Sequence, residues 1–301
     1  MHISMKRALP RILVTGKNGQ VGHDLCFVLK GRAEVTAIDI EDVDFTDPSA
    51  IERAVVEARP DLVMNPAAYT AVDRAEQEPD LARSVNAAAP GVIAAQARQL
   101  GIPVIHYSTD YVFDGDKKDP YTEDDAPNPQ TVYGRTKLDG ENAVRESGAD
   151  FIILRLAWVY AVRGSNFMLT MLRLGSGDRE IRVVDDQYGS PTWSRMIAAA
   201  SADIAMMLLD GKVPAGNIFH LTAEGRTNWY DYAMRIFELA VRSRILDKMP
   251  VVKPVSTAEY AAPAARPESS VLSCEKLERM TGISLPSWEE QLEKAIRELS
   301  L

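Results

Sequence analysis

The chain has 301 residues, 46% hydrophobic and 26% charged, a balance that is ordinary for a globular protein and excludes a disordered one. Lysine and arginine number 34 against 43 aspartates and glutamates, so the formal net charge is −9. An acidic chain without a basic block argues against a nucleic-acid binder and against a membrane-surface binder. The length is typical of two domains, or of one large α/β domain with an added lobe.

The cysteines and the apolar runs indicate the cellular compartment in which we expect the protein. Cys26 and Cys274 are the two cysteines, too few and too far apart for a disulfide framework or for metal-ligand spacing. The longest apolar stretch, 196–209, is interrupted by Ser201 and Asp203, which predicts no membrane span. We therefore expect a cytoplasmic protein with reduced thiols.

Strand-like and helix-like segments alternate through the first half of the chain. Strands are predicted at 11–15, 34–39, 61–65, 104–108 and 151–156, and helices at 20–29, 49–58, 80–101 and 133–147. This alternation predicts an α/β fold with a Rossmann-type, doubly wound parallel sheet and helices on both faces.

The regular alternation of strands and helices ends after residue 160. Helices are predicted at 167–174, 194–209, 229–243 and 287–299, strands at 181–184 and 217–221, and an extended loop at 253–267, which is rich in proline and alanine. We predict that residues 1–160 and 187–222 form a dinucleotide-binding Rossmann domain. Residues 161–186 and 223–301 are predicted to form a smaller C-terminal α/β substrate-binding lobe.

A glycine-rich loop follows the first strand and opens the first helix. Gly16 suits a tight turn, Gly19 a close approach of the backbone to a pyrophosphate, and Gly22 close packing of helix on sheet. Asp39 ends the second predicted strand, where an acid accepts hydrogen bonds from ribose hydroxyls; alone, it would equally be a solvated strand end. Together the loop and Asp39 predict dinucleotide binding.

Tyr133 and Lys137 share one face of a predicted helix, one turn apart. A free phenol has a pKa of about 10, and we expect the ammonium to lower it towards neutrality, so that the phenol serves as an acid–base group. An isolated pair of this spacing is more often an ordinary surface pair. Here the fourth strand ends in Ser108, Thr109 and Asp110, which places a hydroxyl at the edge of the sheet where ligands bind.

On these motifs the chain resembles the extended short-chain dehydrogenase/reductase superfamily and, within it, the dTDP-4-dehydrorhamnose reductase family. The resemblance runs through residues 16–22, 65–73, 106–115, 132–138, 158–160, 186–192 and 265–267. The segment 108–113 with Trp158 is the part more specific to the reductases.

The resemblance implies a set of site residues. Tyr133 would be the acid, Lys137 would also hold the nicotinamide ribose, and Thr109, Asp110 and Trp158 would meet the sugar. The cofactor would be lined by Gly16, Gly19, Gln20, Val21, Gly22, Asp39, Ile40, Asp44, Phe45, Ala67, Ala68, Tyr69 and Thr70, together with Tyr133 and Lys137. Plainer alternatives stay open: Phe45 as core, Trp158 as a buried strand residue and Asp110 as a turn cap.

The implied reaction is the reduction by NADH or NADPH of the 4-keto group of dTDP-4-dehydro-L-rhamnose. Tyr133 would donate the proton and Thr109 would hydrogen-bond the carbonyl oxygen. Arg266, a candidate for the sugar diphosphate, could equally be a surface arginine. The acidic run 39–42 favours NADH, whereas Lys17 could reach a 2′-phosphate.

Two alternative functions have to be considered, and one position departs from the metal-binding pattern of the family. Dehydratases of the superfamily place Asp and Glu after the threonine, but Tyr111 follows Asp110 here, which disfavours dehydration. The regulatory β-subunit of methionine adenosyltransferase shares the fold, and Thr109 with Trp158 favours the reductase. Some family members bind Mg²⁺ near a dimer contact, where Asp24 could be a ligand; Arg195 stands at the second ligand position, so the sequence predicts no metal and leaves a homodimer open.

Overall fold

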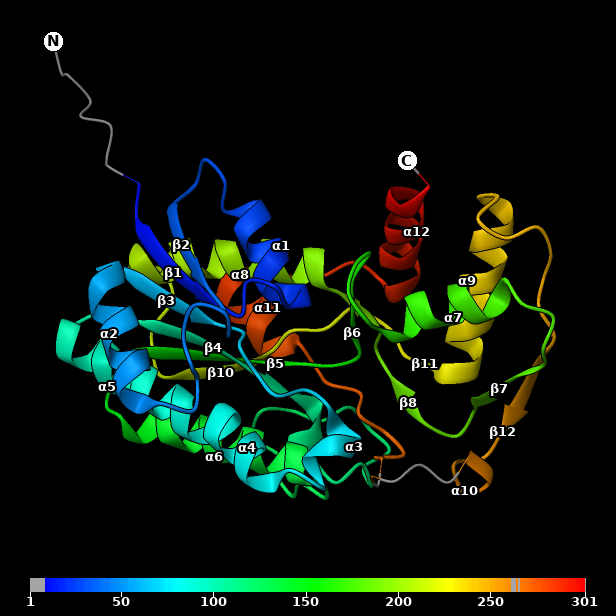
Figure 1. Ribbon diagram of the computed structural model, residues 1–301, viewed down its shortest axis with the longest axis horizontal. Coiled ribbons are helices and arrows are strands. Elements are labelled where there is room, and N and C mark those ends of the chain that lie inside the picture. The colour runs from blue at the N-terminus through cyan, green and yellow to red at the C-terminus, as the bar shows by residue number, and fades with distance from the viewer. Residues whose placement is uncertain (1–8, 261–263, 265, 301) are drawn as a thin grey trace, which may run out of the picture.

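Six parallel strands form the centre of the protein, in the order β10-β5-β4-β3-β1-β2. The computed structural model describes residues 9–260, 264 and 266–300 (Figure 1). The strands are β1 (Arg11–Thr15), β2 (Glu34–Ile38), β3 (Leu62–Asn65), β4 (Val104–Thr109), β5 (Phe151–Leu156) and β10 (Asn217–His220). The order reverses at β1, as in doubly wound sheets, so the predicted Rossmann-type fold is confirmed.

Helices cover both faces of this sheet, which is why β3 and β4 are buried along their whole length. Figure 1 shows α1 (Gln20–Val28), α8 (Ser194–Leu209) and α11 (Glu275–Thr281) on one face. The other face carries α2 (Pro48–Ala58), α5 (Ala89–Leu100) and α6 (Val132–Glu146).

The helix predicted over 80–101 is not one regular α-helix. It consists of α4 (Pro79–Arg83), the π-helical η1 (Ser84–Ala88) and α5. Pro90 is the reason, because it has no N–H to donate and its ring conflicts with the carbonyl four residues earlier, on Asn86. That carbonyl instead faces Gly140 of α6, where a Cβ atom would come within 2.1 Å of it. The wider turn therefore lets α6 approach closely.

The remaining elements build a smaller lobe beside the sheet, on the right of Figure 1. Its helices α7 (Phe167–Gly175), α9 (Trp229–Arg242) and α12 (Trp288–Leu299) share one apolar core. The predicted loop 253–267 is wrong in its first part, because β12 (Val252–Val255) pairs with β7 (Ile181–Val184) and α10 (Thr257–Tyr260) follows. Pro254 is tolerated there because β12 is an edge strand. Residues 261–263 and 265 of that loop lie outside the described residues.

Short strands connect the sheet and the lobe. β6 (Val159–Tyr160) pairs with β9 (Thr192–Trp193), and β8 (Tyr188–Gly189) with β11 (Thr227–Asn228). α8 and α11 both pack with the six-stranded sheet, α11 beside β10. The division into two domains stays a prediction. Within the part of the chain described, no helix combines the length and the apolar character needed to span a membrane.

Candidate active site

The glycine-rich loop has the shape that its sequence predicts. Gly16 has a φ of +62°, in the left-handed region, and a Cβ on Gly22 would lie 2.0 Å from the Gly16 carbonyl oxygen. Gly19 is the N-cap of α1 and has no side chain to cap the first-turn N–H groups. The loop thus presents bare backbone and the positive end of a helix, which fits a pyrophosphate.

Two predicted cofactor residues on α1, Val21 and Gln20, contact other parts of the protein. Val21 is buried. The Gln20 amide turns towards the smaller lobe, where Asn166 donates to it at 2.9 Å. Gln20 therefore links the start of α1 to the segment before α7.

The end of β2 is acidic and ordered by the glycine loop. Asp39 accepts hydrogen bonds from the backbone N–H groups of Asn18 (2.8 Å) and Ile40 (2.7 Å). The Lys17 ammonium lies 2.5 Å from Asp42, and the Ile40 side chain is exposed. The carboxylate of Asp39 is therefore fixed beside the loop, while Lys17 is engaged with the acidic run.

The loop after β3 packs directly on the glycine turn. A Cβ on Gly16 would come within 2.9 Å of Ala67, and Asn86 holds the Tyr69 backbone by both its N–H (2.8 Å) and its C=O (3.0 Å). Asn86 also donates to Thr136 on α6, at 3.1 Å. The sequence analysis did not identify Asn86, whose one signal was an asparagine in an otherwise alanine-rich run.

The remaining predicted cofactor residues differ in exposure. Ala68 is half-buried and Thr70 exposed, beside Tyr69. Asp44 is exposed, and hydrogen bonds from Thr46 lower the pKa of its carboxyl. Phe45 is buried in the core between β1, β3, α2 and α5, which is the plainer of the two expectations for this residue.

Tyr133 and Lys137 lie on the first turns of α6, whose N-cap Thr131 accepts a hydrogen bond from Gly134. The Lys137 ammonium is buried and donates to the Tyr107 carbonyl of β4 at 2.6 Å. Burial lowers the pKa of Lys137 to about 8, and the carboxylate of Glu141 opposes that shift.

The expectation that Lys137 lowers the pKa of Tyr133 is wrong. Burial raises the pKa of Tyr133 to about 12, and a hydrogen bond with Thr109 opposes the rise. The ammonium is directed to a backbone carbonyl instead. The phenol is therefore protonated at neutral pH, which is the form that a proton donor needs.

The carboxyl end of β4 brings Thr109 to this phenol. Thr109 donates to Asp110 at 2.9 Å, and both residues are buried. Burial raises the pKa of Asp110 to about 6, and hydrogen bonds with the Ser270 and Thr109 hydroxyls oppose the rise. The turn-cap alternative for Asp110 is wrong, because the cap of this turn is Thr109, which accepts from the Tyr111 N–H at 3.2 Å.

Trp158 is not a buried strand residue, because it lies between β5 and β6 with a φ of +46° and is half-buried. Its ring stacks on Trp229 at a centroid distance of 3.5 Å, and its Nε1 donates to Ser270 at 3.2 Å. A Cβ on Gly189 would come within 2.3 Å of the indole ring. Gly189 is thus a residue whose function the sequence did not reveal.

Arg266 reaches the same region from the C-terminal segment. Its guanidinium lies 3.2 Å from Asp73, and its charge opposes the effect of burial on the pKa of Tyr111. The Tyr111 ring meets the Tyr133 ring edge-on at 5.6 Å. The neighbouring Ala265 lies outside the described residues.

At the position where some family members bind Mg²⁺, Asp24 pairs with an arginine of the chain itself. Arg195 Nε donates to Asp24 at 2.8 Å, and Ser194 donates to the other oxygen of Asp24 at 2.5 Å. Arg195 also lies 3.2 Å from Glu298. Among the described residues, no group of three or more His, Cys, Asp or Glu side chains could hold a metal ion.

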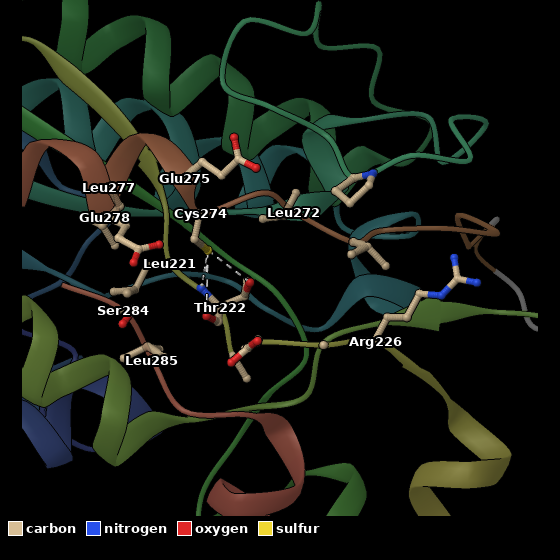
Figure 2. A pocket seen from close by; sticks show the side chains of 15 residues that line it. Leu221, Thr222, Arg226, Leu272, Cys274, Glu275, Leu277, Glu278, Ser284 and Leu285 are labelled. Atoms are coloured by element: carbon tan, nitrogen blue, oxygen red, sulfur yellow. Dashed lines mark hydrogen bonds between the residues drawn. The ribbon is translucent and has the colours of Figure 1, made fainter. Parts of the chain in front are cut away.

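A separate hollow of about 570 Å³ opens at the carboxyl end of β10 (Figure 2). Its lining includes Thr222, Arg226 and Cys274, with Thr222 Oγ1 and Cys274 Sγ 3.4 Å apart, and none of the predicted site residues. Cys26 and Cys274 are both free thiols.

Taken together, the parallel sheet, the bare glycine turn and the Tyr133–Lys137 helix beside Thr109 define a reductase-type member of the extended short-chain dehydrogenases. Comparison with known proteins narrows this class. A family model described as the RmlD substrate binding domain matches residues 10–301. The chain belongs to the dTDP-4-dehydrorhamnose reductase family.

Individual relatives match along nearly their whole length. The dTDP-4-dehydrorhamnose reductase of Burkholderia thailandensis is 41% identical over 294 residues, which cover 96% of this chain and 99% of the relative. A crystal structure of the Clostridium acetobutylicum reductase superposes with a TM-score of 0.88 at 40% identity, covering 97% of this chain and 100% of that one. The Bacillus anthracis reductase, crystallised in complex with NADP, gives a TM-score of 0.87 at 36% identity over 96% and 99% of the two chains.

Proposed function

We propose that this protein reduces the 4-keto group of dTDP-4-dehydro-L-rhamnose to give dTDP-L-rhamnose, with NADH or NADPH as reductant. The relatives that match the whole chain are named for this reaction, and one of them binds NADP. The observation that carries the proposal is the placement of Tyr133, one helical turn before Lys137 at the start of α6, against the carboxyl end of β4, where Thr109 lies.

The residues of this chain fit a dinucleotide. The turn at Gly16, Gly19 and Gly22 leaves a cradle that side chains would fill, and Asp39 stands at the end of the next strand. These residues would hold the diphosphate and the adenine ribose, and Lys137 would hold the nicotinamide ribose. When bound, the nicotinamide supplies the hydride.

Three side chains would act on the sugar. Tyr133 donates its phenolic proton to the oxygen at C4 as that oxygen gains negative charge, and the Thr109 hydroxyl hydrogen-bonds the same atom. The Asp110 carboxyl group, beside Thr109, can accept a hydrogen bond from a sugar hydroxyl. Trp158 would form one wall, and Arg266 would contact the diphosphate.

The alternatives are disfavoured by the same site. Dehydration needs a carboxylate after Asp110, and the aromatic Tyr111 occupies that place, packed against Tyr133. A regulatory subunit would not need a buried proton donor hydrogen-bonded to Thr109. The cytoplasmic location and a homodimer stay predictions.

One assay tests the function. The protein is supplied with dTDP-4-keto-6-deoxyglucose and a 3,5-epimerase, the oxidation of NADH or NADPH is followed, and the product is identified by NMR. Formation of dTDP-L-rhamnose is expected. Cofactor oxidation that is independent of the epimerase would instead indicate a reductase for another sugar, and no oxidation would favour the regulatory subunit.

A further inference from the structure

A buried ion pair lies directly behind the Tyr133–Lys137 face of α6. Glu141 follows Lys137 by one helical turn and accepts two hydrogen bonds from Arg155 of β5, at 2.9 and 2.7 Å. The side chains of Glu141 and Arg155 are 1% and 3% exposed. Two charges held this far from water are costly unless their geometry is good, so the pair calls for an explanation beyond stability.

The pair connects three elements of the site. Ser108 of β4 donates to Glu141 at 2.5 Å, and Ser108 is the sheet neighbour of Arg155. Thr109 follows Ser108 directly, and Lys137 donates to the carbonyl of Tyr107, the residue before it. Glu141 therefore ties the helix that carries Tyr133 and Lys137 to the strand that carries Thr109.

Glu141 also acts on Lys137 by its charge. The carboxylate opposes the effect of burial on the pKa of the ammonium, so it favours the charged form. Arg155 cannot replace it, because its own charge has the same sign as the ammonium, and its Nη1 atom has no hydrogen-bond partner. The guanidinium instead lies over the Phe113 ring, 5.1 Å from the centroid.

Among the described residues, Glu141 is the anion whose charge raises the pKa of Lys137. His106 on β4 is buried and neutral, because burial and the Lys137 charge lower its pKa, and Tyr133 is a protonated phenol. Asp110 on η2 (Asp110–Val112) lies beside Thr109. The charged residues of the packed helices are exposed or half-exposed: Asp73, Arg74, Glu76, Asp80, Arg83 and Arg98.

We propose that Glu141 is a positioning residue of the active site: it locks α6 to β4 and β5 through Ser108 and Arg155, and it keeps the Lys137 ammonium charged. This proposal deepens the proposed function and rests on it. A purely structural clamp would hold the elements together without affecting the protonation of Lys137, which separates the two roles experimentally.

The test replaces Glu141 by the isosteric, neutral glutamine. We expect the alkaline limb of the kcat/KM profile to move down by roughly one pH unit, because the variant loses the charge that opposes the effect of burial on the Lys137 pKa. Glu146→Gln is the matched control, because it removes the same charge from an exposed position of the same helix and leaves the limb in place.

A double variant keeps the proposal testable if Glu141→Gln alone does not fold. Glu141→Gln with Arg155→Gln leaves no unpaired buried charge, so its melting temperature should recover towards that of the wild type. Because the double variant loses the Arg155 cation as well as the Glu141 anion, its alkaline limb should lie between those of Glu141→Gln and the wild type. A limb at or above the wild-type position in either folded variant would overturn the charge role.

A readout that does not depend on turnover separates this proposal from the proposed function. The Lys137 signal is followed by NMR in protein labelled at lysine ¹³Cε and assigned with Lys137→Arg. A lower midpoint in Glu141→Gln supports the proposal even if the wild type reduces another sugar. Unchanged midpoints with an active wild type would refute the role of Glu141 alone.

Discussion

Gly189 lies so close to Trp158 that a Cβ atom on the glycine would fall 2.3 Å from the indole ring. The indole ring also stacks on Trp229, and its Nε1 donates a hydrogen bond to Ser270. The backbone of Trp158, with a φ of +46°, is in a conformation that costs energy in most residues. Gly189 therefore fixes where one wall of the proposed sugar site stands.

Gly189→Ala should displace this indole. We expect a rise in KM for the sugar nucleotide of about tenfold, as for the loss of roughly one good contact, with little change in cofactor affinity. Steady-state kinetics and cofactor titration measure the two effects. Gly177→Ala is the control, because its Cβ meets no atom nearer than 3.4 Å. Equal losses in both affinities would place Trp158 outside the sugar site.

The nucleotide half of the site was predictable because its signals are local. Gly16, Gly19 and Gly22 act through backbone geometry within one turn, and Tyr133 and Lys137 through the helical repeat. The six parallel strands follow from short apolar runs between helices. These features need no knowledge of distant residues, and the fold class predicted from them is confirmed.

The features that the sequence did not reveal depend on contacts between distant residues and on the burial of side chains. Asn86 meets Thr136 across 50 residues, and Gly189 meets Trp158 from a separate short strand. The Tyr133 pKa was predicted in the wrong direction because spacing on a helix gives no measure of burial, and burial is the larger effect here. The π-helical turn before Pro90 was likewise hidden by a composition that suits a regular helix.

Tyr133→Phe should remove most of the activity and spare cofactor binding. The variant loses the proton donor, while the ring keeps its edge-on contact with Tyr111. General acids contribute about 10² to 10⁴ in rate, so kcat should fall by that factor. Single-turnover kinetics and a cofactor titration check this; turnover near the wild-type rate would exclude Tyr133 as the acid.

Asp110 should make the protein less stable as pH rises. Its pKa is about 6 in the folded protein and about 4 in an unfolded chain, so between these values the folded state holds the proton more tightly. Asp110→Asn lacks this effect. The free energy of unfolding of the variant, relative to the wild type, should therefore increase by about 2 kcal/mol between pH 4 and pH 7.

Urea unfolding across this pH range measures the difference. Asp114→Asn is the control of opposite sign, because the hydrogen bond from Tyr121 lowers the pKa of Asp114. Its relative stability should fall as pH rises. A flat difference for Asp110→Asn would mean that the carboxyl is ionised at no cost.

Turnover should persist without added metal. Arg195 places its guanidinium on Asp24, so the carboxylate is neutralised within the chain. Mg²⁺ requires oxygen ligands, and an arginine repels it. We expect the same kcat before and after treatment with EDTA and gel filtration. Loss of activity with EDTA and its recovery with Mg²⁺ would show that the reductase depends on a site elsewhere.

Cofactor choice depends on the acidic run at the end of β2. Asp39 is fixed by two backbone N–H groups, and a 2′-phosphate near it would meet repulsion from Asp39, Glu41 and Asp42. Lys17 could offset this, but its ammonium lies 2.5 Å from Asp42 and 3.4 Å from Glu41. To bind a phosphate, the lysine would have to leave both carboxylates and give up rotamer freedom.

We therefore expect both cofactors to work, with NADH at least as good as NADPH. The ratio of kcat/KM for the two, measured at fixed salt, decides the matter because these charges are exposed and screened. Lys17→Ala should leave the NADH value nearly unchanged and lower the NADPH value slightly. A preference of the wild type for NADPH above about tenfold would mean that Lys17 outweighs the acidic run. In that case Lys17→Ala must abolish the preference, and a preference that survives the substitution would place the 2′-phosphate away from both Lys17 and Asp39.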